Sequence, residues 1–382
     1  MAGIYISWPF CAQKCTYCNF ASGVLPRELE SRYLTALLRE FAAHEWAWTP
    51  ETVYIGGGTP SAMDDAALTR LLSALPNTPL PFFSRPDSAG DLVSDIWREA
   101  TLEAAPGTLN SNRVTAWQNA GINRVSLGVQ SFIRSELART GRRHDAQVVE
   151  RDVALLRAAG IPNINVDLIA GLPGQTEQSW RESLEAVLRL KVPHISIYML
   201  EVDDDSRLGA EILLGGKRYG ANDVPSDDAI GNFYETAVEL LQSHGIHRAE
   251  ISNFARTGAE SVHNLKYWKR EPYIGFGADA HSFDGSSRWQ NVESAHDYVN
   301  RSERGDSVRC AETSSDAMEE KFFVGLRLSE GVHADDADWQ RYGATFEYFL
   351  STGMLERANG NLRLTPRGVM VSNEIFQEFL PA

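Results

Sequence analysis

Short apolar runs alternate with longer amphipathic stretches along the first 200 residues of the chain. The short runs predict buried strands; Thr52–Ile55, for example, is β-branched and aromatic and is stopped by three glycines. The longer stretches predict helices, because apolar side chains such as Leu34 and Leu38 recur at helical spacing within residues 27–46. The predicted strands are residues 3–7, 52–55, 101–104, 124–129, 164–169 and 194–200, and the predicted helices are residues 27–46, 64–75, 110–120, 146–159, 179–190 and 230–243.

Six strand-then-helix units in a row are typical of an α/β fold, with a parallel sheet and helices outside it. Residues that can carry chemistry recur where these strands end. This placement favours a curved sheet over a flat one, as in a partial TIM-like (β/α)6 barrel. We therefore expect residues 1–200 to form such a partial barrel.

The rest of the chain predicts an extension and a small terminal unit. Residues 201–314 begin with a loop at 203–228 and continue with short strands and aromatic residues. Residues 315–382 form a small, mostly helical, winged-helix-like unit with a hairpin around Asn359-Gly360. Residues 76–99, which contain several prolines, predict an irregular surface excursion.

Composition and charge exclude several classes of protein. Hydrophobic residues make up 43% of the chain and charged residues 23%, as in ordinary globular proteins. The net charge of −15 repels phosphate, so we expect no nucleic-acid partner, and the terminal unit, with 11 acidic and 6 basic residues, shares this charge. The sequence shows no membrane span and no secretion signal, which predicts a cytoplasmic location.

Three of the four cysteines form a C-x3-C-x2-C group directly after the first predicted strand: Cys11, Cys15 and Cys18. Cys310 is remote, so a disulfide framework is not indicated. Three thiolates hold three corners of a cubane [4Fe–4S] cluster and leave the fourth iron open to a small molecule. The alternative is structural zinc, which needs a fourth ligand that the neighbouring sequence does not offer.

In this position the cysteine group resembles the signature of radical S-adenosylmethionine (SAM) proteins. The resemblance implies that SAM chelates the open iron and that the reduced cluster can release a 5′-deoxyadenosyl radical from it. Over nearly the whole chain the sequence is similar to the oxygen-independent coproporphyrinogen III oxidase family. By this resemblance, eight residues at or near strand ends bind SAM: Tyr5, Gly57, Gly58, Thr59, Glu103, Gln130, Arg142 and Asp167.

The chemistry of these residues suits that role. A carboxylate such as Glu103 can accept from the ammonium or ribose hydroxyls of SAM, and Arg142 can pair with its carboxylate. The glycines at the end of the second strand let the backbone approach a ligand and offer it N–H and C=O groups. Taken singly, Glu103 and Asp167 have an alternative role as helix caps, and Gln130 as a partner of buried backbone.

Two features of the sequence indicate to which branch of this family the chain is more similar, the oxidases or the heme chaperones. Phe20 stands where the oxidase has a further cysteine, which argues against decarboxylase activity. His263-Asn264-Leu265-Lys266-Tyr267-Trp268 resembles a segment that is implicated in heme binding in the heme-chaperone branch. A neutral imidazole is a competent axial ligand, so His263 is the predicted heme contact, with His281 as a weaker candidate. The alternative is that His263 forms hydrogen bonds in a loop while the aromatic side chains fill the core.

We therefore expect a heme chaperone that carries a [4Fe–4S] cluster and SAM and delivers heme to hemoproteins of the respiratory chain. The alternatives are a coproporphyrinogen III oxidase that decarboxylates propionates oxidatively, and a zinc-stabilised binding protein. The sequence assigns no catalytic residue and names no electron donor. It leaves open a homodimer and a peripheral membrane contact through the client.

Overall fold

The computed structural model describes residues 2–76, 84–86, 92–94 and 97–380. Its centre is a run of parallel strands that are neighbours in space in their order along the chain. These strands are β1 (Ala2–Trp8), β2 (Pro50–Gly57), β5 (Glu99–Ala104), β6 (Arg124–Gln130), β7 (Asn163–Ala170) and β8 (His194–Met199). The connecting helices include α1 (Arg27–Ala43), α2 (Asp65–Ser73), α3 (Ser111–Asn119), α5 (Ala146–Ala158), α6 (Glu177–Leu190) and α8 (Asp227–Ser243).

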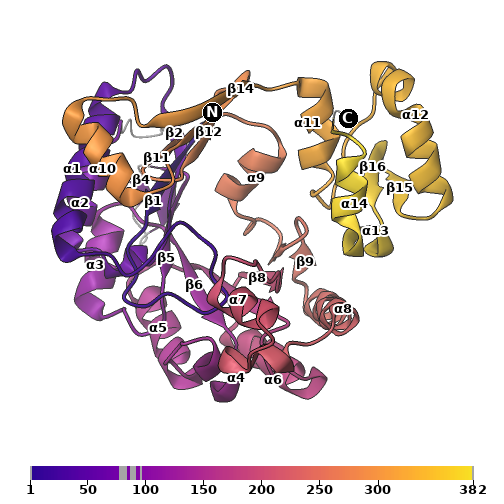
Figure 1. Ribbon diagram of the computed structural model, residues 1–382, viewed down its shortest axis with the longest axis horizontal. Helices are drawn as coiled ribbons and strands as arrows, with labels where there is room; N and C mark the ends of the chain where they lie inside the picture. The colour runs from indigo at the N-terminus through magenta and orange to yellow at the C-terminus, as the bar shows by residue number, and fades with distance from the viewer. Residues whose placement is uncertain (1, 77–83, 87–91, 95–96, 381–382) are drawn as a thin grey trace.

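These helices cover the outer side of a curved sheet (Figure 1). The predicted α/β fold with a partial barrel is therefore confirmed. Side-chain caps explain where several of the helices begin: Asp64 accepts from two backbone N–H groups at the start of α2, and Asn110 and Asp145 accept from one each at α3 and α5. Such caps satisfy N–H groups that have no partner within the helix.

Further strands extend the sheet at both edges. Next to β1 lies the parallel strand β11 (Tyr273–Phe276), followed by β12 (His281–Phe283), β13 (Ser287–Asn291) and β14 (Arg309–Ser314), which are antiparallel. Next to β8 lie β10 (Asn253–Ala255) and β9 (His247–Arg248), also antiparallel. The sheet has 12 strands among the described residues, so the extension continues the barrel wall rather than adding a separate layer.

The two faces of the parallel strands differ in polarity. On the outer face, side chains such as Ile4, Val53 and Leu102 are fully buried against helices. On the inner face, polar side chains such as Ser126 and Asn165 occupy the alternate positions. Parallel strands that are covered on both faces are normally apolar throughout, so the polar inner face indicates a ligand-binding space rather than a second core.

A short helix, α9 (Val262–Trp268), lies inside the curve of the sheet (Figure 1), where it contacts residues at the amino-terminal starts of β2 and β5. The carboxylate of Glu99, at the start of β5, accepts from the Ser261 hydroxyl and from the backbone N–H groups of Val262 and His263, at 2.8–3.0 Å. The Lys266 ammonium is buried and pairs with Glu51 at 2.7 Å. Because a helix of this length gains little stability by itself, these contacts hold it in place.

Other segments depart from the sequence-based expectation. Residues 203–228 are not simply a loop, since they contain α7 (Arg207–Leu213), capped by Ser206, and a 3-10 helix at Arg218–Asp223. Three further helices were also not predicted: α4 (Arg134–Arg139), α9 and α10 (Ala295–Arg304).

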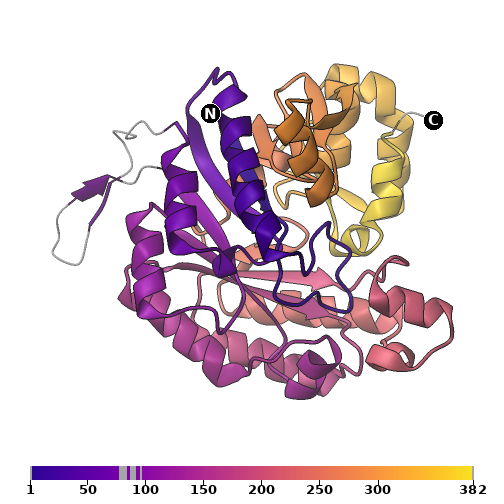
Figure 2. The same cartoon turned by 60° about the vertical axis from the view of Figure 1, so that its left-hand side comes forward.

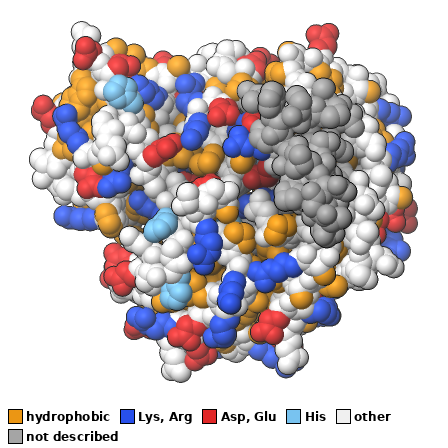
Figure 3. Space-filling model, turned by 180° about the vertical axis from the view of Figure 1, so that it is seen from behind, with side chains coloured by type: hydrophobic (Ala, Val, Ile, Leu, Met, Phe, Trp, Pro, Cys, Tyr) orange, Lys and Arg blue, Asp and Glu red, His pale blue; other side chains and the backbone are white. Residues whose placement is uncertain are grey.

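Residues 76–99 are described only in part. Within the predicted surface excursion, β3 (Ser84–Pro86) and β4 (Leu92–Ser94) pair antiparallel and project from the body of the molecule (Figure 2). The prediction is wrong at its end, since Trp97 is buried and Glu99 begins β5; most of the remaining residues lie outside the described ones. Acidic and basic side chains are intermixed on the face that Figure 3 shows.

The last part of the chain folds around an aromatic core. Its elements are α11 (Ala317–Gly325), α12 (Asp336–Ser351), β15 (Leu355–Ala358), β16 (Asn361–Leu364), α13 (Pro366–Met370) and α14 (Ser372–Gln377). The hairpin turns at Asn359 and Gly360, both with positive φ, as a type I′ turn requires. Rings of Phe322, Phe346 and Phe379 pack together.

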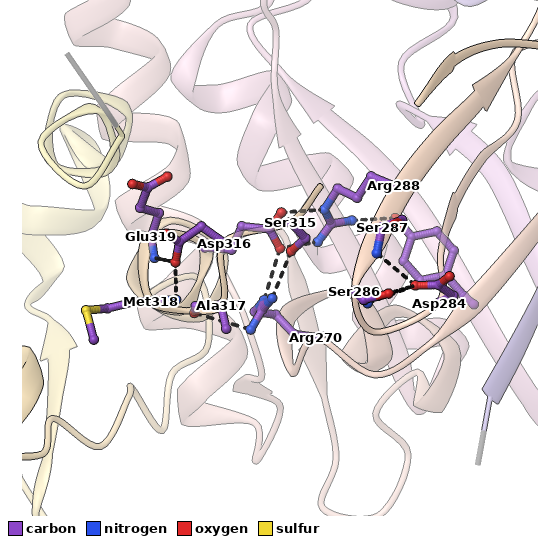
Figure 4. Close-up of polar contacts among 12 residues, drawn as sticks. Arg270, Asp284, Ser286, Ser287, Arg288, Ser315, Asp316, Ala317, Met318 and Glu319 are labelled. Atoms are coloured by element: carbon purple, nitrogen blue, oxygen red, sulfur yellow. Dashed lines mark hydrogen bonds and ion pairs between the residues drawn. The ribbon is translucent and has the colours of Figure 1, made fainter. Parts of the chain in front are cut away.

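Ion pairs join this unit to the sheet (Figure 4). Arg270, after α9, and Arg288, on β13, converge on Glu320 of α11 at 3.0 and 2.7 Å. Arg270 also donates to the Ser315 hydroxyl at 2.9 Å. Burial alone would raise the pKa of Glu320, but the hydrogen bonds from these arginines and Ser315 lower it to about 2.

Among the described residues, no helix has both the length and the apolar character needed to cross a bilayer.

Removing one ring of the aromatic core tests whether it stabilises the terminal unit. Phe322 is fully buried, so Phe322→Ala should lower the unfolding free energy of this unit by about 3–5 kcal/mol, because it leaves a cavity. Denaturant unfolding together with hydrogen exchange of the β15–β16 amides measures the effect. Tyr348→Ala is the matched control, since Tyr348 is 62% exposed. Equal losses in the two variants would contradict the assignment of the core.

Candidate functional site

The cysteines lie on the loop between β1 and α1, at the carboxyl end of the barrel strands. Backbone hydrogen bonds shape this loop: the Cys11 N–H donates to the Gly23 carbonyl at 2.9 Å, and the Cys18 N–H donates to the Cys15 carbonyl at 3.3 Å. The Thr16 N–H donates to the carbonyl of Thr140 at 3.3 Å, which ties the loop to the opposite wall. All three thiols are free and partly exposed.

The three sulfurs influence one another. Burial raises the pKa of Cys11, hydrogen bonds from the Thr59 and Ser22 hydroxyls lower it, and the nearby Cys18 and Cys15 thiolates raise it. A shared cationic centre would relieve the repulsion between three thiolates, and soft sulfur ligands select iron–sulfur clusters or zinc. Cys310 is exposed on β14. In the part of the chain that the structure describes, no three His, Cys, Asp or Glu side chains are arranged to hold a metal ion.

Two carboxylates project from the inner face below this loop. Glu103 accepts from the Tyr54 hydroxyl at 2.9 Å and from the Gly57 N–H at 3.1 Å. Asp167 accepts from the Asn165 amide at 2.7 Å and from the Ser126 hydroxyl at 3.1 Å. Burial and the charge of Asp167 raise the pKa of Glu103 to about 7. Burial also raises the pKa of Asp167, although its hydrogen bonds oppose the shift.

Both carboxylates belong to strands, Glu103 to β5 and Asp167 to β7, so neither is a helix cap. At pH 7 the first is only partly ionised. A cationic ligand placed between them would favour the ionised form of both, because opposite charges nearby lower a carboxyl pKa. The pair is therefore suited to a ligand such as SAM, which carries a sulfonium charge.

The glycine segment after β2 packs tightly against the end of β1. The Gly58 N–H donates to the Trp8 carbonyl at 2.8 Å, and the Thr59 N–H to the Phe10 carbonyl at 2.9 Å. A Cβ on Gly58 would lie 2.7 Å from the Phe10 oxygen, so only glycine fits there. The N–H groups of Gly57, Gly58 and Thr59 are thus used within the protein. What this segment can offer a ligand is its carbonyls and the Thr59 hydroxyl beside Cys11.

Gln130 and Arg142 leave polar atoms without partners. Gln130, at a bulge in β6, has φ of 69°, and its buried side-chain oxygen has no hydrogen-bond partner. The Nε of Arg142 is likewise buried without a partner, while its Nη1 donates to the Gly128 carbonyl at 2.6 Å. Backbone strain and unpaired buried polar atoms occur together at ligand sites. These residues therefore fit a polar cofactor at the carboxyl end of the barrel.

A pocket that opens to solvent connects the cysteine loop to the inner face, with about 450 Å³ of empty space when the solvent at its mouth is included. Phe20 lies on its rim and exposes 66% of its surface. Asp279, in the turn between β11 and β12, contributes a second carboxylate to the pocket, beside that of Glu103. The pocket is lined by Tyr5, Ser7, Pro9, Phe20, Ala21, Ser22, Gly57, Glu103 and Asp279.

His263, the predicted heme contact, lies on α9 at the other end of the inner face. It is fully buried, and its ring nitrogens form hydrogen bonds with Thr52 and Tyr267, both at 2.8 Å. Burial and the nearby charge of Lys266 lower the pKa of His263 to about 3, so the ring is neutral. His281, the weaker candidate, is exposed at the start of β12.

Predicted residues thus fall into two groups. Tyr5, Gly57 and Glu103 line the pocket beside the cysteine loop, whereas His263 is separated from it by Tyr54. Tyr54, Ser126 and Asp279 are further polar residues of this site that were not predicted from the sequence. The first two could have been found from the period-2 alternation, because each shares the inner face with a predicted residue.

The Radical SAM superfamily model matches residues 5–187, and the HemN C-terminal domain model matches residues 313–371. The structure superposes on coproporphyrinogen III oxidase (HemN) from Escherichia coli with a TM-score of 0.80. The two sequences are 18% identical, and the match covers 99% of this chain and 89% of that chain. The fold and the cysteine site therefore define a radical SAM protein.

Relatives similar over the whole length narrow the assignment. A protein named Heme chaperone HemW from Lactococcus lactis is 32% identical, over 98% of this chain and 96% of its own. Another of that name from Bacillus subtilis is 32% identical, over 100% of this chain and 99% of its own. The chain belongs to the family of these HemW proteins within the radical SAM superfamily. The superfamily implies a [4Fe–4S] cluster and SAM, which together supply one-electron reductive chemistry when bound.

Single replacements of the cysteines test the cluster assignment. Cys11→Ala, Cys15→Ala and Cys18→Ala should each lose most of the iron and sulfide taken up in anaerobic reconstitution, because each removes one corner ligand. Cys310→Ala is the matched control and should retain about 4 iron atoms per chain. Stoichiometric zinc, or full iron content in all three loop variants, would contradict the assignment.

Proposed function

We propose that this protein binds heme and transfers it to a recipient hemoprotein, with a [4Fe–4S] cluster and SAM held at the carboxyl end of the barrel. The relatives named as heme chaperones support this function through their similarity over the full chain. The three thiols, the paired carboxylates and the unpaired Gln130 and Arg142 atoms support the cofactor part. We propose Tyr5, Gly57, Gly58, Thr59, Glu103, Gln130, Arg142 and Asp167 as the SAM contacts.

The exposed ring of Phe20 is the observation that carries the heme part. Phe20 lies on the cysteine loop itself, at the pocket rim, in the position where the oxidase pattern has a further cysteine. Because the Phe20 side chain is 66% exposed, a flat apolar molecule that covers it is stabilised, by roughly 25 cal/mol for each Å² of apolar surface removed from water. A porphyrin face across the rim would cover Phe20, while the pocket itself remains available to SAM.

The axial ligand to the heme iron is a separate question. His263 is neutral, as an iron ligand must be, but ligation would require it to give up a hydrogen bond to Thr52 or Tyr267. His281 is exposed to solvent two residues after Asp279, which lines the pocket. Heme ligation by His263 therefore requires α9 to move, whereas ligation by His281 does not require a buried group to be released.

A protein that transfers heme needs a recipient for it. The recipient is proposed to be a respiratory hemoprotein, and any membrane contact would be made through that recipient. A cytoplasmic location is consistent with this role. Decarboxylation of coproporphyrinogen III is less well supported, because the likeness to HemN at 18% identity shows the fold alone and Phe20 replaces a cysteine of the oxidase pattern.

Charge substitution at the rim tests the heme proposal. Phe20→Asp should weaken heme binding by about 10- to 100-fold, because it removes the apolar contact and adds charge. Titration of reconstituted protein with heme, followed at the Soret band, measures the affinity. Val24→Asp is the matched control, because Val24 is 69% exposed on the same loop and does not line the pocket.

Two outcomes would contradict the proposal. The first is wild-type heme affinity in Phe20→Asp, or an equal loss in both variants. The second is formation of protoporphyrinogen from coproporphyrinogen III in an anaerobic assay with SAM and a reductant, which would favour the oxidase.

A further inference from the structure

The ring of His263 is enclosed on every side by the barrel wall. Its nitrogens are occupied by Thr52 of β2 and Tyr267 of α9. Its face packs on the ring of Tyr54, with centroids 5.3 Å apart and planes 31° from parallel. On the β1 side, a Cβ on Gly3 would lie 3.1 Å from the imidazole, so the backbone there leaves no room for a ligand.

Tyr54 connects His263 to the pocket, because it lies beside the imidazole and also contacts Glu103, which lines the pocket. Its hydroxyl donates to one oxygen of Glu103 at 2.9 Å, while the Gly57 N–H donates to the other oxygen at 3.1 Å. The Tyr54 ring also stacks on Tyr5, with centroids 6.1 Å apart. The orientation of Glu103 therefore depends on where Tyr54 lies, and Tyr54 rests on His263.

The helix that presents His263 is held firmly. Glu99 caps its first turn and Lys266 forms the buried pair with Glu51. The ring of Tyr267 packs edge-on against Tyr273 at 4.6 Å, and the Tyr273 hydroxyl accepts from Arg288 at 3.1 Å. Figure 4 shows Arg288 directed toward α11, where it also meets Glu320. The contacts around His263 thus form one continuous support.

We propose that His263 is a positioning residue for the SAM site: it supports Tyr54, which in turn holds Glu103 toward the pocket. This inference rests on the proposed contact between Glu103 and SAM. It gives the His-Asn-x-x-Tyr-Trp segment a role at the cofactor wall instead of ligation of heme iron. The full burial of His263, its two occupied ring nitrogens and the neighbouring Tyr54 ring, tilted by 31° against it, support this role together.

The pH dependence of SAM affinity provides a readout that a general loss of structure would not reproduce. Below its pKa of about 7, Glu103 is protonated and attracts cationic SAM less strongly, so affinity should rise as the pH increases through 7. The hydrogen bond from Tyr54 lowers the pKa of Glu103, whereas burial and Asp167 raise it. The titratable groups around Glu103 are Tyr5, Tyr54, Asp167, Tyr198 and Tyr267, together with Asp279, which lines the same pocket.

Tyr54→Phe removes only the hydroxyl and should move the midpoint of SAM binding upward by about 1 pH unit. SAM affinity of the reconstituted protein, measured by calorimetry, should then fall by roughly 10-fold at pH 6 and change little at pH 9. His263→Ala should shift the midpoint in the same direction. In the double variant, His263→Ala should add nothing to the effect of Tyr54→Phe, because His263 acts through Tyr54.

The matched control is His296→Ala, which replaces an exposed imidazole on α10, outside this support, and should leave the SAM profile unchanged. Unchanged SAM binding in His263→Ala would overturn the inference, as would effects that add fully in the double variant. Loss of heme binding in His263→Ala with an intact SAM profile would overturn it in favour of a heme ligand. SAM binding is measured without heme. If the wild-type protein did not bind heme, the proposed function would be contradicted, but the role of His263 at the SAM site could still be tested in this way.

Discussion

The structure of the site depends on the polar inner face of the parallel sheet. Buried polar side chains are costly unless they are hydrogen-bonded, so the inner face requires a closed network. Asn165 is the centre of that network: its amide nitrogen lies 2.7–2.8 Å from side-chain oxygens of Ser126, Asp167 and Ser196, which share its two N–H donors, and its oxygen lies 2.7 Å from a ring nitrogen of His194. These contacts let a polar surface persist where an apolar core would otherwise form.

The two ends of the inner face are finished differently. At the amino end, α9 fills the space and satisfies the acids Glu51 and Glu99. At the carboxyl end, the cysteine loop leaves an open pocket, and atoms of Gln130 and Arg142 have no partner within the protein. Chemistry is therefore expected at the carboxyl end, as in barrels generally, while the amino end provides rigidity.

The sequence predicted features that depend on local pattern. The strand and helix alternation, the Asn359-Gly360 hairpin and the cysteine spacing each involve residues that are near one another in the chain. The sequence did not predict α9, because its seven residues carry no strong helical pattern and are stabilised by Glu99 and Glu51, more than 160 positions away. For the same reason, the spacing in His-Asn-x-x-Tyr-Trp could not show that both nitrogens of His263 are occupied by Thr52 and Tyr267.

The central claim is that the open end of the barrel brings a cluster with one free iron into contact with SAM. Electron paramagnetic resonance of the reduced, reconstituted protein tests it most directly, by comparing spectra recorded with and without SAM. Direct coordination predicts that SAM changes the g values of the reduced [4Fe–4S] signal. An identical cluster spectrum at saturating SAM would contradict it.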